Sequence, residues 1–155
     1  MPLDVFYLAL DRLSVDIDLN YPGALDRAAM LAERKDQEDA LSRILTSQGY
    51  QVRRQPDEHA DGKWIARHTS SLGGQGSLEA DINFMMREGL FGAARMDSVQ
   101  LGGRQASNVL VVDKHDIVAG KLVALLRRRA ARDLFDARRI FKMTDLDWRL
   151  VKPRC

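Results

Sequence analysis

Two segments of the chain alternate between apolar and polar residues with the period of two that is typical of a half-buried β-strand. In residues 14–21 (SVDIDLNY), Val, Ile and Leu alternate with Ser, two Asp and Asn. Residues 77–84 (SLEADINF) repeat the pattern, with Leu, Ala, Ile and Phe opposite Ser, Glu, Asp and Asn. We therefore predict two strands that turn their apolar side chains toward a core and their acidic side chains away from it.

Apolar residues at helical spacing predict three helices. The first covers residues 24–48, and its wholly polar run 35–39 favours a break or an exposed bend. The second covers residues 114–129, with Asp113 placed as its N-cap, and the third covers residues 132–142.

Shorter strands are predicted between the first two helices and before the second. Residues 50–54 and 63–69 are expected to form a hairpin, and residues 99–101 and 109–112 are further strand candidates. This order of elements predicts an α+β fold, a small mixed β-sheet flanked by helices. The length of 155 residues suits one domain over residues 1–155.

Composition excludes several classes of protein. A hydrophobic fraction of 45% and a charged fraction of 30% are ordinary for a globular chain and argue against disorder. The only cysteine, Cys155, allows neither a disulfide framework nor a cysteine-based metal site. The chain has no apolar run of membrane-spanning length, and its N-terminus lacks a basic leader, so we expect a cytoplasmic protein without a membrane partner.

The charges are separated along the chain, although 24 Lys+Arg nearly balance 22 Asp+Glu. Five aspartates and one arginine lie between residues 4 and 26, whereas six arginines and two aspartates lie between residues 127 and 139. Such a pattern predicts a region that holds cations and another that holds anions. A dipolar surface without a function is the alternative.

Asp16, Asp18 and Asp81 are the sharpest candidates for chemistry. Each lies on the polar face of an alternating strand, so two neighbouring strands would gather the three carboxylates on one surface. Hard divalent ions such as Mg²⁺ prefer oxygen ligands, and carboxylate groups of this kind hold metals that act on phosphoryl groups. Glu79 shares the face as a further ligand or a spectator, and three solvated surface aspartates are the alternative.

Basic residues near the C-terminal end are candidates for phosphate contact. Lys121 is the one charged residue in the apolar stretch 117–126, so it either extends to solvent or enters a pocket that an anion neutralises, for which a triphosphate is suited. In the block 127–136, arginines either contact phosphate or RNA, or pair with aspartates on a helix surface; Arg132 and Arg139 are placed to pair with Asp133 and Asp136.

The remaining rings carry no clear functional signal. The three histidines, at positions 59, 68 and 115, lack ligand spacing and are expected on the surface or in the core. Trp64, Trp148 and the five phenylalanines are expected in the core.

Two motifs resemble a known family. RLSVDIDLNY is similar to the R-x-S-x-D-(I/L)-D-L signature of AbiEii/AbiGii-type nucleotidyltransferases, the toxins of abortive-infection toxin–antitoxin systems. DIVAGKLVALLRRRAARDLFD resembles that family's later motif, K-L-x-A-L-x-x-R followed by R-D-(L/F)-(Y/F)-D. The two motifs occur in the family's order, and the resemblance extends over residues 12–141.

The resemblance implies a polymerase-type nucleotidyltransferase fold and metal-dependent transfer of a nucleotide from a nucleoside triphosphate to an acceptor, such as tRNA or another RNA. Mg²⁺ or Mn²⁺ would be the cofactor, and a cognate antitoxin the protein partner. The residues implied are Asp16, Asp18 and Asp81 for metal and catalysis, Asp133 for catalysis, and Ser14, Lys121 and Arg128 for the nucleotide phosphates.

One stretch departs from the family pattern. Members carry a G-G-T-A-L or G-S segment before the D-x-D pair, whereas PLDVFYLALDRL has no glycine, serine or threonine there. Relative to the family, the chain therefore looks short at its N-terminus. This leaves two alternatives open: a catalytically inactive relative that binds protein or nucleic acid, and a metal-dependent nuclease or phosphohydrolase.

Overall fold

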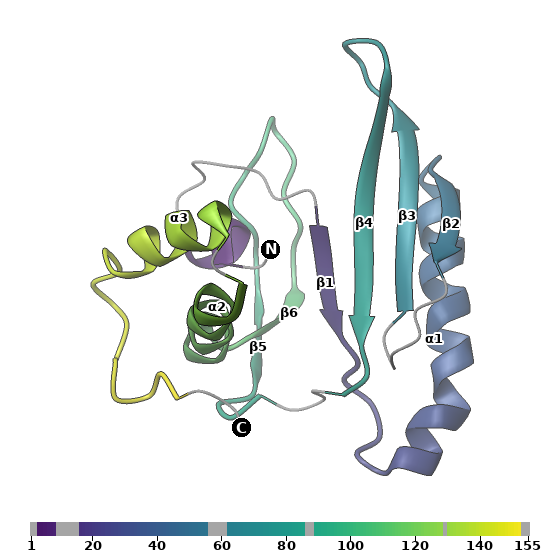
Figure 1. Ribbon diagram of the computed structural model, residues 1–155. Helices are drawn as coiled ribbons and strands as arrows, with labels where there is room; N and C mark the ends of the chain where they lie inside the picture. Colours follow the sequence, from purple (N-terminus) through teal and green to yellow (C-terminus); the bar gives the residue numbers. More distant parts are fainter. Residues whose placement is uncertain (1–2, 9–15, 56–61, 86–88, 129, 153–155) are drawn as a thin grey trace. The chain divides into compact units, whose positions relative to one another are not determined.

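A computed structural model describes residues 3–8, 16–55, 62–85, 89–128 and 130–152 (Figure 1). The chain divides into two compact units: unit 1 comprises Met1 and Ser14–Glu88, and unit 2 comprises Pro2–Leu13 together with Gly89–Cys155. Each unit has its own hydrophobic core. The expectation of one domain over residues 1–155 stays a prediction.

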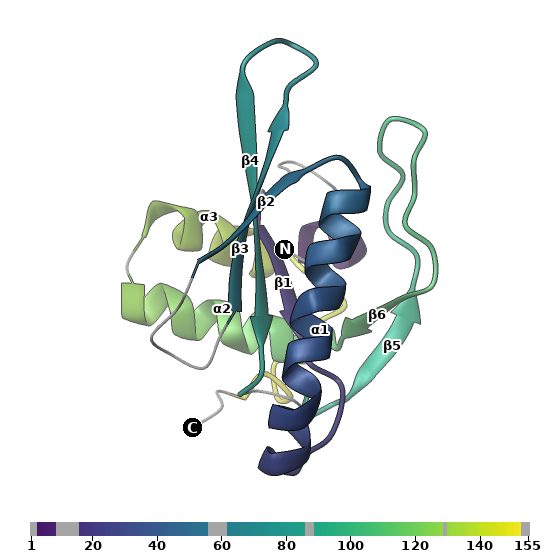
Figure 2. The same ribbon diagram turned by 90° about the vertical axis from the view of Figure 1, so that its right-hand side faces the viewer.

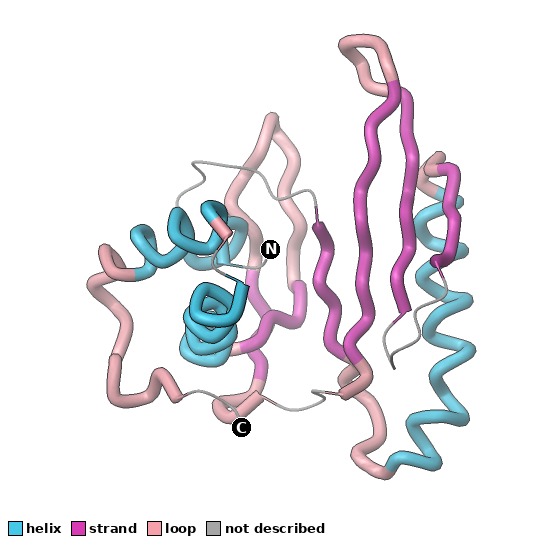
Figure 3. Tube along the Cα trace, in the orientation of Figure 1, coloured by secondary structure: helices cyan, strands magenta, loops and turns pink. Residues whose placement is uncertain are grey.

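Unit 1 is built on a four-stranded sheet with the order β1-β4-β3-β2 (Figure 3). Its strands are β1 (Asp16–Asn20), β2 (Gln51–Gln55), β3 (Gly62–Thr69) and β4 (Gln75–Asn83). β1 runs parallel to β4, and the two other pairs are antiparallel, which confirms the predicted β2–β3 hairpin and the mixed sheet.

Helix α1 (Arg27–Ser47) covers one face of this sheet (Figure 2). The core between them is formed by apolar side chains from the helix and the strands, among them Met30, Leu45, Trp64, Ala66, Ala80, Ile82 and Phe84. The predicted break in residues 35–39 is wrong, because α1 is continuous there. Glu38 pairs with Arg34 one turn earlier, at 2.7 Å, and with Arg54 on β2, at 2.8 Å, so ion pairs hold the polar run in helical form.

Unit 2 combines the N-terminal and C-terminal parts of the chain. Its elements are a short π-helix, η1 (Leu3–Tyr7), the antiparallel strands β5 (Ala93–Met96) and β6 (Val109–Val112), and helices α2 (Lys114–Arg128) and α3 (Ala131–Ile140). Leu3 of η1 is buried in one core with Val118, Ile140, Met143 and Leu146. A side-chain ion pair between Asp4 and Arg139 also joins η1 to α3.

The strand expected at residues 99–101 is wrong. Leu101 and Arg104 form a single bridge across Gly102 and Gly103, which both have positive φ and turn the chain back on itself. β5, which pairs with β6, was not predicted. No helix in the described part of the chain is long and apolar enough to cross a bilayer.

Candidate functional site

Acidic side chains share the face of the unit 1 sheet that α1 does not cover. In the parallel register of β1 and β4, Asp16 lies opposite Glu79, and Asp18 lies opposite Asp81. The alternate residues of β4, Ala80 and Ile82, are buried on the helix side. Because partners in a sheet project to the same side, the register brings Asp16, Asp18 and Asp81 to one face, as the alternation predicted. We call this set of side chains, with Glu79, the acidic face.

One basic side chain lies within the acidic face. Lys63 on β3 is the register partner of Asp81, and its Nζ lies 2.8 Å from Glu79 Oε2. Sequence reasoning missed Lys63, since only the pairing of β3 with β4 places it beside the carboxylates.

The pKa values of Asp81, on the acidic face, and of Lys63, beside it, are both raised. Burial raises the pKa of Asp81 above its usual range, and the nearby Asp18, Glu79 and Asp16 raise it further, while Lys63 acts in the opposite direction. The hydrogen bond to Glu79 is the main cause that raises the pKa of Lys63; burial opposes it, and the charges of Asp81, Glu79 and Asp16 add to it. The shift of Asp81 is therefore due mainly to burial and that of Lys63 mainly to its contact with Glu79, and the neighbouring carboxylates add to both.

The donor chemistry of the acidic face suits a divalent cation. Asp81 Oδ1 is buried and has no hydrogen-bond partner among the described residues, and Asp18 lies directly opposite Asp81 in the register. Mg²⁺ commonly takes one or two protein carboxylates and completes its shell with water and substrate oxygens, so such a pair suffices. Across the described residues, however, no three His, Cys, Asp or Glu side chains are gathered closely enough to hold a metal. The described residues therefore supply a pair of carboxylate ligands, Asp18 and Asp81, and not a complete coordination site.

The predicted phosphate-binding residues that the structure describes belong to unit 2. The Nζ atom of Lys121 lies 3.2 Å from Asp136 Oδ2, and the two side chains are only 16% and 5% exposed, so Lys121 does not extend to solvent. Arg128, half exposed, lies 3.2 Å from the fully buried Asp133. The phosphate-binding roles of Lys121 and Arg128 and the catalytic role of Asp133 stay predictions. Ser14 lies outside the described residues.

The pairing of the aspartates on α3 differs from the expected one. Asp133 pairs with Arg128 and Asp136 pairs with Lys121, both on α2, while Arg139 reaches Asp4 in η1. Asp133 and Asp136 lie on the buried side of α3, where each meets a basic residue of α2. Asp133 Oδ2 is buried, and none of the residues that the structure describes forms a hydrogen bond with it. These carboxylates form a charged seam between α2 and α3.

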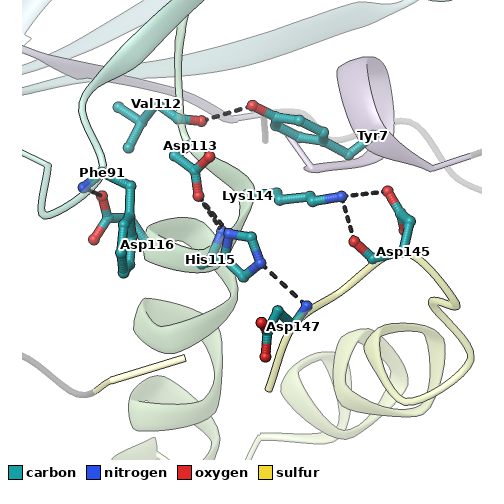
Figure 4. A network of polar contacts seen from close by, with 9 residues as sticks. All are labelled: Tyr7, Phe91, Val112, Asp113, Lys114, His115, Asp116, Asp145 and Asp147. Atoms are coloured by element: carbon teal, nitrogen blue, oxygen red, sulfur yellow. Dashed lines mark hydrogen bonds and ion pairs between the residues drawn. The ribbon is translucent and has the colours of Figure 1, made fainter. Parts of the chain in front are cut away.

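A second polar network surrounds the start of α2 (Figure 4). Asp113 Oδ1 accepts a hydrogen bond from the backbone N–H of His115 at 2.8 Å, which confirms Asp113 as the N-cap, and lies 2.7 Å from His115 Nδ1. On the other side of the ring, Nε2 accepts a hydrogen bond from the backbone N–H of Asp147 at 3.2 Å. The buried His115 thus ties the C-terminal segment to α2, a role that sequence spacing does not reveal.

Neighbouring contacts extend this network to other elements. Lys114 donates to both the carbonyl and the carboxylate of Asp145, and the backbone N–H of Phe91 donates to Asp116. Tyr7 in η1 donates to the carbonyl of Val112 at 3.0 Å, and burial, followed by the charge of Asp113, raises the pKa of Tyr7. The network therefore joins η1, β6, α2 and the C-terminal segment inside unit 2.

The expectation that the large rings lie in the core is only partly correct. Trp64 and Phe84 are fully buried in unit 1. Trp148 and Phe141, by contrast, are 42% and 66% exposed and stack on each other with ring centroids 5.2 Å apart. Phe91 and Phe135 are exposed as well.

Residues 2–152 match the family described as the nucleotidyl transferase AbiEii toxin of a type IV toxin–antitoxin system. The match spans both units, including the acidic strands and the charged seam between α2 and α3. The chain belongs to this family. The predicted membership is therefore confirmed, and the family description names a nucleotidyltransferase toxin.

A solved structure supports the fold of this AbiEii-family chain. MenT4, a nucleotidyltransferase toxin from Mycobacterium tuberculosis H37Rv, is similar with a TM-score of 0.64 and 21% sequence identity. The similarity covers 97% of this chain but 50% of MenT4, so the chain spans about half the length of that neighbour. The predicted α+β, nucleotidyltransferase-like fold is confirmed. No curated protein matches the chain.

Proposed function

We propose that this AbiEii-family chain is a metal-dependent nucleotidyltransferase domain that moves a nucleotide from a nucleoside triphosphate to an RNA acceptor such as tRNA. The placement of Asp18 opposite Asp81, whose buried Oδ1 has no hydrogen-bond partner in the described part of the chain, carries this proposal. In this proposal, Asp18 and Asp81 would hold Mg²⁺ or Mn²⁺, with Asp16 beside them on the same face, and the ion would supply charge stabilisation at the phosphoryl group.

The reaction is a displacement at the α-phosphorus. An acceptor hydroxyl oxygen forms the new bond to phosphorus, the bond to the bridging oxygen of the β-phosphate breaks, and pyrophosphate leaves with its electron pair. The proton of the attacking hydroxyl passes to a carboxylate of the acidic face or to water as the new bond forms. Lys121 and Arg128, the basic residues of the later motif, are proposed to contact the phosphates, which requires them to exchange Asp136 and Asp133 for phosphate oxygens.

Transfer of label from each of four α-³²P nucleoside triphosphates to total tRNA tests this function. Wild type is expected to label RNA only with Mg²⁺ or Mn²⁺ present. Asp18→Asn and Asp81→Asn are expected to abolish labelling, because they remove the charge but keep the shape of the side chain. Asp36→Asn, an equal change at an exposed position of α1, is the matched control and is expected to label like wild type.

The other outcomes distinguish the alternatives. Free nucleotide released without labelled RNA would favour a phosphohydrolase or nuclease. If isothermal titration detected no triphosphate binding at all, a binding module without catalysis would be favoured. Within the type IV toxin–antitoxin assignment, we propose a cognate antitoxin as the protein partner; its co-expression is expected to relieve growth arrest caused by wild type.

A further inference from the structure

Lys63 is placed to act on the acidic face as a cation that belongs to the chain. Its ammonium contacts Glu79, and it lies across the strand pair from Asp81. The groups that face it are carboxylates from two strands, Asp16 on β1 and Glu79 and Asp81 on β4. A positive charge at this point stabilises carboxylates that would otherwise repel one another.

We propose that Lys63 is a tethered counter-cation that competes with a divalent ion for the acidic face and thereby weakens its metal affinity. This inference rests on the proposed function, because it concerns the same carboxylates. In the absence of a metal, Lys63 balances part of the charge of Glu79 and Asp81. A divalent ion that binds Asp18 and Asp81 then meets the repulsion of the ammonium, and its affinity is reduced.

The size of the effect follows from the exposure of the pair. The side chains of Lys63 and Glu79 are 35% and 45% exposed, so water and salt screen the charges considerably. Removal of one positive charge a few ångströms from the ion is expected to tighten binding by about three- to tenfold at low ionic strength. The same change is expected to have little effect at high salt, whereas a packing defect would not depend on salt in this way.

The experiment measures the affinity of the full chain for Mn²⁺ alone, by the electron paramagnetic resonance signal of the free ion. Lys63→Met removes the charge and keeps the length of the side chain, while Lys63→Arg keeps the charge. Lys35→Met is the matched control, because it removes one positive charge from an exposed position of α1, on the other side of the sheet. Circular dichroism verifies that each variant is folded.

Lys63→Met is expected to bind Mn²⁺ about three- to tenfold more tightly than wild type, and Lys63→Arg and Lys35→Met like wild type. Glu79→Gln is expected to weaken binding, since it removes a negative charge and leaves the ammonium of Lys63 in place. Combining Lys63→Met with Glu79→Gln is expected to return the affinity close to that of wild type.

Equal or weaker Mn²⁺ binding by Lys63→Met, or a gain that persists unchanged at high salt, would overturn the inference. Absence of Mn²⁺ binding in every variant would overturn it too. The proposed function fails by a different result, namely the absence of RNA labelling by wild type with any divalent ion and any triphosphate. If wild type labels RNA but wild type and Lys63→Met bind Mn²⁺ with equal affinity, the proposed function stands and only the role of Lys63 is refuted.

Discussion

Lys121→Met is expected to destabilise unit 2 strongly, because it removes the ammonium that lies against the buried carboxylate of Asp136. At the observed separation of 3.2 Å, an effective dielectric constant near 20 gives an attraction of about 5 kcal/mol. Lys121 is 16% exposed, so water entering the site recovers part of this energy. We expect a loss of about 3 kcal/mol in the free energy of unfolding, at the lower end for a broken buried pair.

The two tryptophans allow each unit to be followed separately. Trp64 lies in unit 1 and Trp148 in unit 2, and each gives one indole N–H signal in a proton–nitrogen correlation spectrum. A urea titration of Lys121→Met at neutral pH is expected to shift the transition seen at Trp148 to lower urea. Arg149→Ala breaks the exposed pair with Asp147 instead, and is expected to leave both transitions unchanged.

The double variant Lys121→Met, Asp136→Leu decides whether the buried charge is the cause. It removes both charged groups, so it is expected to be more stable than Lys121→Met alone. The reasoning would be refuted by a loss below about 1 kcal/mol in Lys121→Met, or by a double variant no more stable than the single one.

Three further changes test other parts of the fold. Asp81→Asn is expected to raise the urea midpoint of unit 1 at pH 7. Because the pKa of Asp81 is higher in the folded chain than in the unfolded chain, ionisation of its carboxyl group lowers the stability of unit 1 as the pH rises through the folded pKa. The stability gained by Asp81→Asn is therefore expected to vanish below the unfolded pKa of about 3.9. Unfolding curves recorded over a series of pH values measure this. Asp113→Ala is expected to lower the stability of unit 2 by about 1 kcal/mol through loss of the N-cap, whereas Asp113→Asn, which can still cap, should lose much less in the same titration. Gly62→Ala places a Cβ atom 2.4 Å from the ring of the buried Trp64, whose indole N–H donates a hydrogen bond to Ser42. The free energy of unfolding of unit 1 is therefore expected to fall by about 1–3 kcal/mol. An unchanged urea transition at Trp64 would contradict this.

The elements that the sequence predicts correctly have local causes. The alternation around Asp16 and Asp81 requires only that one face of each strand be apolar, and it placed both residues on the polar face. Asp113 begins α2 because its own carboxylate reaches an N–H two residues later. The two sequence motifs around Asp16 and Lys121 are also formed by residues that are close in the chain, and they correctly indicated the AbiEii family.

Several of the errors come from contacts between residues far apart in the chain. The polar run around Glu38 stays helical because of Arg54 on β2, and the position of Lys63 depends on the register of β3 with β4. Likewise, Asp136 appeared to belong to a surface helix until α2 placed Lys121 against it. No periodicity within a segment encodes such partners, so the charge balance of the candidate site could not be predicted from the sequence.

The order in which the chain supplies the two units has a consequence for its synthesis. Unit 1 is continuous in sequence, so all its strands have been made once residue 88 has been added. Unit 2 needs Leu3 and Asp4 from the beginning and Ile140 and Arg139 from near the end, and it cannot close its core until both are available. At translation rates of about 5–20 residues per second, the first segment waits for several seconds without its partners. A chain cut short before α3 would therefore contain every strand of the acidic face but lack the helix whose Asp136 pairs with Lys121.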